Sequence, residues 1–215
     1  MKVLETEVEL AEARQLAVKS ILALHPLFKV MPPDLQEIDD YFKYMIAESS
    51  RCKLAWGYYA DGKMVAFLFC YPMKEYLRLQ PPPFPKSKVL QYMQPYEKKL
   101  NEDLSRILTE KNEMEKGLMC EWLVIDPDYK KKEVGALVLY LSYKIYIKLG
   151  WRYFYGMSTN PTSLNLLRTL TGQVLSEVTL EEEPFKGRKF QIIRVDIEEL
   201  RPMIEHMKFS ATPKL

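Results

Sequence analysis

Apolar residues recur at helical spacing near the N-terminus. Between residues 8 and 24 they return every three or four positions, which places them on one side of a helix. His25-Pro26 ends this helix, because proline disfavours helical backbone in the residue before it. A second helix is predicted to begin at Asp34, which follows two prolines and can cap it. Its apolar side carries Leu35, Ile38, Phe42, Met45 and Ile46.

The pattern then changes to strands. Two aromatic and apolar runs, residues 53–60 and 64–71, flank Asp61-Gly62-Lys63. Asp-Gly suits the backbone of a tight turn, so the pattern predicts a β-hairpin. Because the second run is apolar at nearly every position, it indicates a central strand buried on both faces.

Residues 74–117 have a different character. Five residues from Pro81 to Pro85 include four prolines and cannot form regular structure, and a charged helical stretch follows at about 96–115. We interpret this segment as an insertion between strands. Its aromatic residues, Tyr76, Phe84, Tyr92 and Tyr96, are consistent with a lid over a site or with a surface excursion packed on itself.

The second half of the chain alternates strands and helices. An apolar strand at 119–125 leads through Asp126-Pro127 to a largely apolar helix over 132–149, which Gly150 ends. A strand at 151–158, a helix at 160–170, strands at 173–180 and 188–196 and a short helix at 198–207 follow. Helices interleaved with strands predict a mixed α/β sheet with a parallel strand pair at the crossover. We expect one domain over residues 1–215.

Composition limits the class of protein. A formal charge of +2 on 215 residues argues against nucleic acid as a partner. The acidic N-terminus does not resemble a secretory signal, and no apolar run reaches the roughly 18 residues of a membrane span, so we expect a cytoplasmic protein. Cys52, Cys70 and Cys120 are far apart and outside any metal-binding spacing, which favours reduced thiols and no metal.

The turn after the strand at 119–125 has the chemistry of an anion site. The first amides of a helix have no intrahelical acceptor, and the helix dipole favours negative charge there. Lys130, Lys131 and Lys132 precede this helix, so the amides from Glu133 to Ala136 are predicted to bind a phosphate-bearing ligand. The alternative is a solvated, charged start of a helix.

These residues resemble the GNAT superfamily of acyl-coenzyme A dependent N-acyltransferases. The match is the strand and turn Val124-Ile125-Asp126-Pro127-Asp128-Tyr129 followed by Lys130-Lys131-Lys132-Glu133-Val134-Gly135-Ala136. Ser158-Thr159-Asn160-Pro161 and Leu166 to Gly172 are similar to the family's next strand-to-helix junction and closing helix. The resemblance implies a mostly antiparallel central sheet, flanked by helices, with a parallel strand pair at the cofactor site.

The resemblance also implies which residues bind acetyl-coenzyme A or another acyl-coenzyme A. These are Val124, Ile125, Lys130, Lys131, Lys132, Glu133, Val134, Gly135, Ala136, Asn160 and Asn165. Asn160 has a simpler alternative role as a helix cap. The sequence departs from the family at Glu133, where a glycine is usual, and at Leu167, where the family usually has a tyrosine that acts as general acid.

Four residues are candidates for the reaction itself. Glu121 interrupts an apolar strand, where an unpaired carboxylate is costly, so it acts either as a general base or as a structural hydrogen-bonding group. Tyr155 is a candidate acid, as is Tyr143, and core packing is the alternative for both. His25 is predicted to line the acceptor site, although a loop histidine can be incidental.

The sequence and the resemblance together predict an N-acyltransferase that acts on a primary amine of a small molecule or a protein, and the resemblance implies that the acyl group is acetyl. The amine would attack the thioester directly, with Glu121 as base and a strand N–H near Ile125 polarising the carbonyl. The alternatives are a binding or regulatory protein without turnover and a transferase of longer acyl chains. A homodimer is left open.

Overall fold

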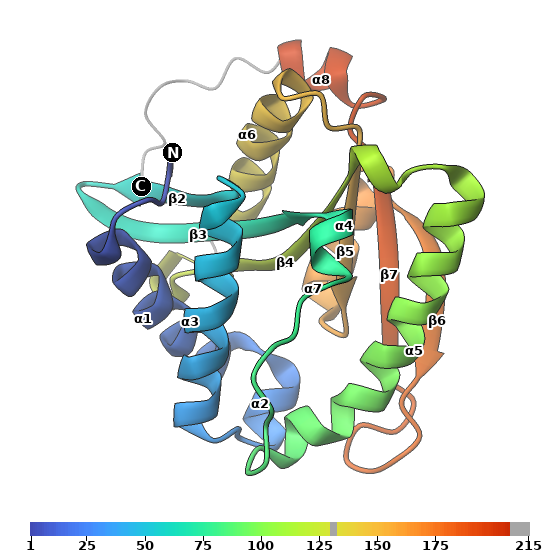
Figure 1. Ribbon diagram of the computed structural model, residues 1–215. Helices are drawn as coiled ribbons and strands as arrows, with labels where there is room; N and C mark the ends of the chain where they lie inside the picture. The colour runs from blue at the N-terminus through green and yellow to red at the C-terminus, as the bar shows by residue number, and fades with distance from the viewer. Residues whose placement is uncertain (130–132, 207–215) are drawn as a thin grey trace.

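The described chain forms one sheet of seven strands in the order β1-β2-β3-β4-β5-β7-β6 (Figure 1). The structure is a computed structural model, and it describes residues 1–129 and 133–206. The strands are β1 (Lys2–Val3), β2 (Ala55–Ala60), β3 (Lys63–Pro72), β4 (Gly117–Ile125), β5 (Tyr153–Ser158), β6 (Gln173–Thr179) and β7 (Lys189–Asp196). Neighbouring strands are antiparallel except β4 and β5, which are parallel. The predicted fold class is therefore confirmed.

Helices cover both faces of the sheet. They are α1 (Glu7–Leu24), α2 (Pro26–Val30), α3 (Leu35–Arg51), α4 (Met73–Tyr76), α5 (Lys88–Lys111), α6 (Val134–Lys148), α7 (Pro161–Thr169) and α8 (Arg201–His206), with short 3-10 turns η1 (Met114–Lys116) and η2 (Pro127–Tyr129). Buried residues of α1, α2, α3 and α5 join one core cluster, and those of α6, α7 and α8 join a second. In Figure 1, α1 and α3 lie over β2 and β3, α5 runs along β6 and β7, and α6 lies behind the sheet.

The N-terminal helices begin at the capping residues that their sequences favour. The Thr6 side chain accepts from the Glu9 amide, and the Glu9 carboxylate accepts from the Thr6 amide at 3.1 Å. Asp34 caps α3 by accepting from the Glu37 amide at 3.0 Å. These bonds, which are reciprocal at Thr6 and Glu9, satisfy amides that have no intrahelical acceptor. The first helix, the start of the second and the hairpin of β2 and β3 lie within a residue or two of their predicted positions.

The segment between β3 and β4 contains a longer helix than the sequence suggested. α5 begins at Lys88 and includes Pro95 in its interior. We predicted a start near residue 96 because proline usually breaks a helix. The burial of Val89 and Met93 against the main core stabilises the first turns of α5 despite that proline. Within the described residues, no helix combines the length and hydropathy needed to cross a membrane.

Candidate functional site

β4 and β5 separate halfway along β4. Their parallel pairing runs from Gly117↔Tyr153 to Cys120↔Gly156 and goes no further. Beyond that point, residues 122–125 of β4 pair only with β3, and residues 157–158 of β5 pair only with β7. Four of the five residues at 121–125 are partly exposed, although β4 is central in the sheet. The strand pair therefore presents unpaired backbone at its open end.

An extra residue in β4 lies at the point of separation. Phe69 of β3 pairs with Trp122, while the next residue, Cys70, pairs with Cys120, which leaves Glu121 as a β-bulge. A bulge breaks the alternation of side chains along a strand. Glu121 and Trp122 consequently lie on the same face of the sheet, toward α3.

The open edge of β4 offers backbone donors. The Asp126 amide donates to the Val65 carbonyl of β3 at 2.8 Å. Because amide directions alternate along a strand, the amides of Leu123 and Ile125 point the other way, toward the side where β5 has separated. Their position matches the predicted N–H group near Ile125.

Glu121 has one hydrogen-bond donor in the described part of the chain. The Tyr41 hydroxyl of α3 donates to Glu121 Oε1 at 2.5 Å, and Trp122 Nε1 donates to the Tyr41 oxygen at 3.2 Å. Burial raises the pKa of Glu121, and the bond from Tyr41 opposes that rise. A carboxylate whose pKa is raised toward neutrality is suited to accept a proton from an amine.

His25 lies next to the same tryptophan. It joins α1 to α2, and its ring centroid is 5.7 Å from that of Trp122 and 4.4 Å from that of Phe28. Burial, and then the charge of Arg188, lower the pKa of His25 to about 4. Its buried Nδ1 has no hydrogen-bond partner among the described residues. The structure thus brings the predicted His25 and Glu121 together around Trp122 and Tyr41, with the imidazole neutral at pH 7.

Tyr155 has a different environment from the one its predicted role requires. It is fully buried, and its hydroxyl donates to the Glu113 carboxylate, which also accepts from Arg194 at 2.9 and 2.7 Å. A Cβ atom on Gly117 would lie 3.2 Å from the Tyr155 ring, so the ring leans toward the closed end of the strand pair. Burial and the Glu113 bond raise the pKa of Tyr155 far above its ordinary value. The side chain is therefore placed as a core group rather than as an acid at the open end.

The turn between β4 and α6 is only partly described. The predicted Lys130, Lys131 and Lys132 lie outside the described residues. Glu133 adopts the left-handed region at φ 55°, and its carbonyl accepts from the Leu137 amide at 3.1 Å. The amides of Val134, Gly135 and Ala136 have no acceptor within the described residues.

Gly135 also has a packing role. A Cβ atom there would lie 2.9 Å from Ile125 Cδ1, so the glycine allows α6 to approach the end of β4. Val134 and Gly135 are buried, while Val124 is buried on the opposite face of β4. The glycine of the motif thus sets the distance between helix and strand, whatever ligand the turn accepts.

A buried aspartate anchors the start of the turn between β4 and α6. Asp126 is 1% exposed and accepts from Lys19 of α1 and Lys63 of β3, each at 2.9 Å. It also accepts from the Asp128 amide at 3.1 Å. These bonds outweigh burial and lower the pKa of Asp126. Sequence reasoning missed this clamp, because nothing local to Asp126-Pro127 indicates partners 107 and 63 residues away.

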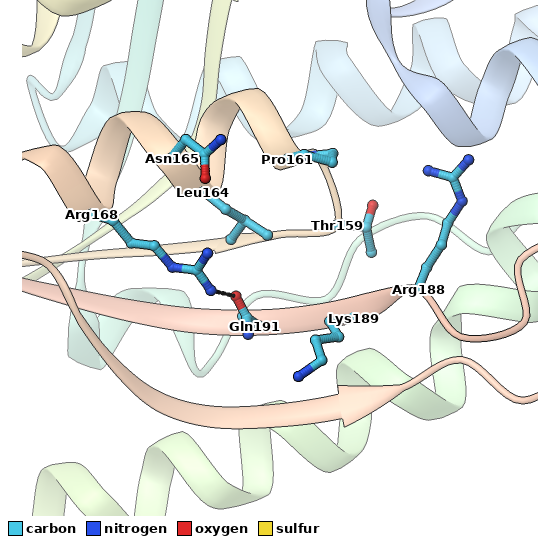
Figure 2. A pocket seen from close by; sticks show the side chains of 8 residues that line it. All are labelled: Thr159, Pro161, Leu164, Asn165, Arg168, Arg188, Lys189 and Gln191. Atoms are coloured by element: carbon cyan, nitrogen blue, oxygen red, sulfur yellow. Dashed lines mark hydrogen bonds between the residues drawn. The ribbon is translucent and has the colours of Figure 1, made fainter.

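Asn160 and Asn165 belong to α7 and its surroundings. Asn160 Oδ1 accepts from the Thr162 amide at 3.0 Å, so it caps the helix, the simpler of its two predicted roles. Asn165 lines a cavity of about 230 Å³ between α7 and the start of β7 (Figure 2). Arg168 donates to Gln191 there at 2.8 Å. The cavity is lined by Thr159, Pro161, Leu164, Asn165, Arg168, Arg188, Lys189 and Gln191.

The predicted insertion is tied to the rest of the protein by its tyrosines. The Tyr96 oxygen accepts from the Glu181 amide at 3.2 Å, and the Tyr92 oxygen accepts from the Glu182 amide at 3.3 Å. The rings of Tyr92 and Phe185 are 5.4 Å apart. α5 is therefore fastened to the loop between β6 and β7.

Two further features define the chemistry available. Leu167 is buried, and its Cδ1 would be 2.8 Å from a Cβ atom on Gly156, so an apolar contact occupies the position of the family's tyrosine. In the described residues, no three His, Cys, Asp or Glu side chains are grouped to hold a metal ion. The site thus contains the carboxylate of Glu121, which lies at a β-bulge among aromatic rings and beside the unpaired amides of β4.

Solved structures share this architecture. Arylalkylamine N-acetyltransferase 2 from Aedes aegypti is 13% identical, with a TM-score of 0.65 over 89% of this chain and 96% of that one. The Drosophila melanogaster polyamine N-acetyltransferase that forms N-acetylagmatine is 14% identical, with a TM-score of 0.60 over 89% and 97%. The C-terminal condensation domain of Ebony, in complex with beta-alanyl-dopamine, is 10% identical, with a TM-score of 0.68 over 88% and 94%.

Comparisons of the sequence give a different result from comparisons of the structure. No protein-family model matches the chain, and no curated protein matches it significantly. The similarity therefore lies in the fold, which is that of the GNAT N-acetyltransferases, and the fold that the sequence resemblance implied is confirmed.

Proposed function

We propose that this protein is an acyl-coenzyme A dependent N-acyltransferase that moves an acetyl group to a primary amine. The observation that carries the proposal is the separation of β4 and β5 at Cys120↔Gly156, with Glu121 bulged at the fork. In this position the unpaired amides of β4 can bind an extended amide-containing chain such as pantetheine by strand-like hydrogen bonds. The solved N-acetyltransferases of the same fold support this assignment.

The reaction requires a neutral amine. Alkylamines have pKa values of about 10.4, so they are mostly protonated at neutral pH. Glu121 accepts a proton from the bound ammonium, and the nitrogen lone pair then attacks the thioester carbonyl carbon. A C–N bond forms, the C–S bond breaks, and the nitrogen gives up its second proton to water as the amide forms. The Ile125 amide stabilises the developing oxyanion.

The leaving group does not need Tyr155. A thiol has a pKa of about 8.5, so the departing thiolate can take a proton from water near neutral pH. Tyr155 donates instead to Glu113, and Leu167 has no acidic hydrogen. Solvent protonation is therefore the route that suits both residues.

The donor site is proposed to follow the turn into α6. The described amides of Val134, Gly135 and Ala136 would face the pyrophosphate of coenzyme A, with Lys130, Lys131 and Lys132 supplying positive charge nearby. Glu133 is the residue that directly precedes α6, and its backbone lies in the left-handed region. Asp126 would hold the turn through Lys19 and Lys63.

The direct test combines binding and turnover. Acetyl-coenzyme A is titrated calorimetrically, and free thiol and the acylated amine are then measured with a panel of alkyl, aryl and diamine acceptors. Saturable binding with matched release of thiol and product is expected. The absence of binding heat at millimolar acetyl-coenzyme A would contradict the proposal. Parallel assays with octanoyl- and β-alanyl-coenzyme A as donors identify which acyl group is transferred.

A second candidate keeps the fold without turnover. Leu167 in place of a tyrosine, and the charged Glu133 at the helix start, are the observations that favour a binding or regulatory protein. Acetyl-coenzyme A binding with no thiol release across the amine panel would make this candidate the better account.

A further inference from the structure

The cavity between α7 and the start of β7 has a polar floor. Gln191 and Thr159 line it and are only 2% and 7% exposed. Arg168 donates to Gln191 Oε1 at 2.8 Å, and the Gln191 side-chain amide donates in turn to Glu177. The Thr159 hydroxyl has no hydrogen-bond partner among the described residues. Because a buried hydroxyl normally has a partner, this cavity offers a ligand a free donor.

The ends of the cavity carry one arginine each. Figure 2 shows Arg168 reaching into the cavity from α7, while Arg188 stands at the opposite end, where β7 begins. Within the described part of the chain, neither arginine forms an ion pair with a carboxylate. Lys189 differs, since it pairs with Glu177 at 2.7 Å. The cavity therefore has at each end a guanidinium that no carboxylate of the protein contacts.

The separation of the two ends suits an elongated ligand. Gln191, which accepts from Arg168, lies three residues after Arg188, or roughly 10 Å along an extended strand. A five-carbon dicarboxylate, with a charge-assisted hydrogen bond of about 2.8 Å at each end, covers a similar span. Pro161 and Leu164 form an apolar wall of the cavity. The volume of about 230 Å³ is far larger than a single water requires.

We propose that this cavity is a binding site for a short linear dicarboxylate. Arg168 binds one carboxylate, and Arg188 and the Thr159 hydroxyl bind the other. The planar fork of a guanidinium matches the two oxygens of a carboxylate, so each end recognises a carboxylate in preference to other groups of the same size. The methylene chain of the ligand lies against Pro161 and Leu164.

The site is separate from the proposed coenzyme A site, because α7 lies between them. Leu166 is on the side of α7 that faces the start of α6, since a Cβ atom on Gly135 would lie 3.7 Å from Leu166 Cδ2. Asn165 and Arg168 instead line the cavity beside β7. The inference therefore does not depend on the proposed function.

Calorimetry with a matched pair of ligands tests the inference. Glutarate and pentanoate have the same five-carbon chain and differ in the second carboxylate. A charge-assisted hydrogen bond at each end should make glutarate bind at least about tenfold more tightly. In Arg188→Gln that ratio should fall toward one. Lys186→Gln removes the same charge two residues away from a side chain that does not line the cavity, and it should keep the ratio.

Three results would overturn the inference. They are equal binding of glutarate and pentanoate by the native chain, an equal loss of the ratio in Arg188→Gln and Lys186→Gln, and binding of inorganic phosphate as tightly as glutarate. The last result would describe a site for a single anion. Thermal unfolding provides a check on the fold of each variant, and glutarate should raise the Tm of the native chain and of Lys186→Gln more than that of Arg188→Gln.

A titration with both ligands separates this inference from the proposed function. Acetyl-coenzyme A should bind with the same affinity in the presence and absence of saturating glutarate, because α7 separates the two sites. Competition between the two would place the cavity in the donor site and overturn the assignment of a separate site. Glutarate binding without any binding of acetyl-coenzyme A would reject the transferase and leave the dicarboxylate site.

Discussion

Glu113 and Glu121 lie on either side of the start of β4, and their surroundings differ. Glu113 precedes η1, is 5% exposed, and accepts two hydrogen bonds from Arg194 as well as one from Tyr155. Glu121 is partly exposed and accepts from Tyr41. The first carboxylate has its charge balanced by a guanidinium, and the second has only a neutral hydroxyl.

Strand pairing explains the difference. Near Glu113, β4 and β5 are joined, and β7 brings Arg194 opposite Tyr155. Near Glu121, β5 has left β4, so no neighbouring strand supplies a compensating side chain. A buried carboxylate paired with a bidentate arginine is a structural group. A carboxylate at an open strand edge that lacks a cationic partner is available to a ligand.

The largest expected effect lies at the closed end. Arg194→Met leaves Glu113 buried without its cation, which should lower the free energy of unfolding by about 3 kcal/mol. Urea denaturation followed by circular dichroism measures the change. Arg106→Met on the exposed side of α5 is the matched control and should change stability little, since its partners are solvated. Similar losses in both variants would contradict the structural role assigned to Glu113.

At the open end the effect should appear in turnover instead. Glu121→Gln keeps the shape of the side chain and removes the base, so kcat/KM should fall by about a hundredfold. Its stability should not fall, because a partly buried charge with one neutral partner is replaced by a neutral amide. Thiol release and thermal unfolding measured on the same preparation separate the two results. A variant with undiminished turnover would show that Glu121 is a structural group after all.

Much of the fold was predictable because it depends on local signals. The helical spacing of α1, the capped start of α3, the Asp-Gly hairpin and the strand, turn and helix around Asp126 were found from residue pattern. These features depend on periodicity, capping and turn chemistry within a few residues. The extent of α5 was missed, because its tertiary packing overrides the effect of Pro95.

The site was predictable in its residue types more than in its contacts. Glu121 stood out as a carboxylate in an apolar strand, and His25 as a loop residue, but no local pattern indicates that Trp122 and Tyr41 connect them. The bulge that turns Glu121 and Trp122 to one face depends on how β3 and β4 align. The partnership of Tyr155 and Glu113 with Arg194 joins residues up to 81 apart, which no local spacing reveals.

A smaller effect tests whether Glu121 is the base whose ionisation controls turnover. The Tyr41 bond favours the ionised form of Glu121, so Tyr41→Phe should raise the pKa of Glu121 further. The acidic limb of the kcat/KM profile should move to higher pH by about one unit, since a bond to a charged group contributes roughly 1.5 kcal/mol. Tyr44→Phe, whose oxygen accepts from the Gln80 amide, is the control. An unchanged limb would mean that it reports another group.

The smallest effect belongs to the tyrosine that sequence reasoning placed in the reaction. Tyr155→Phe removes one neutral donor from Glu113 while Arg194 remains, so stability should fall by about 1 kcal/mol and kcat should stay the same. Tyr143→Phe is the matched control, because the Tyr143 hydroxyl is buried without a partner among the described residues and its loss should be neutral or stabilising. If Tyr155 were the acid that protonates the thiolate, Tyr155→Phe would lower kcat by a hundredfold or so with little effect on unfolding. The structural role and the acid role predict opposite combinations of turnover and stability. This pair of variants therefore decides whether Tyr155 supports Glu113 in the core or protonates the thiolate.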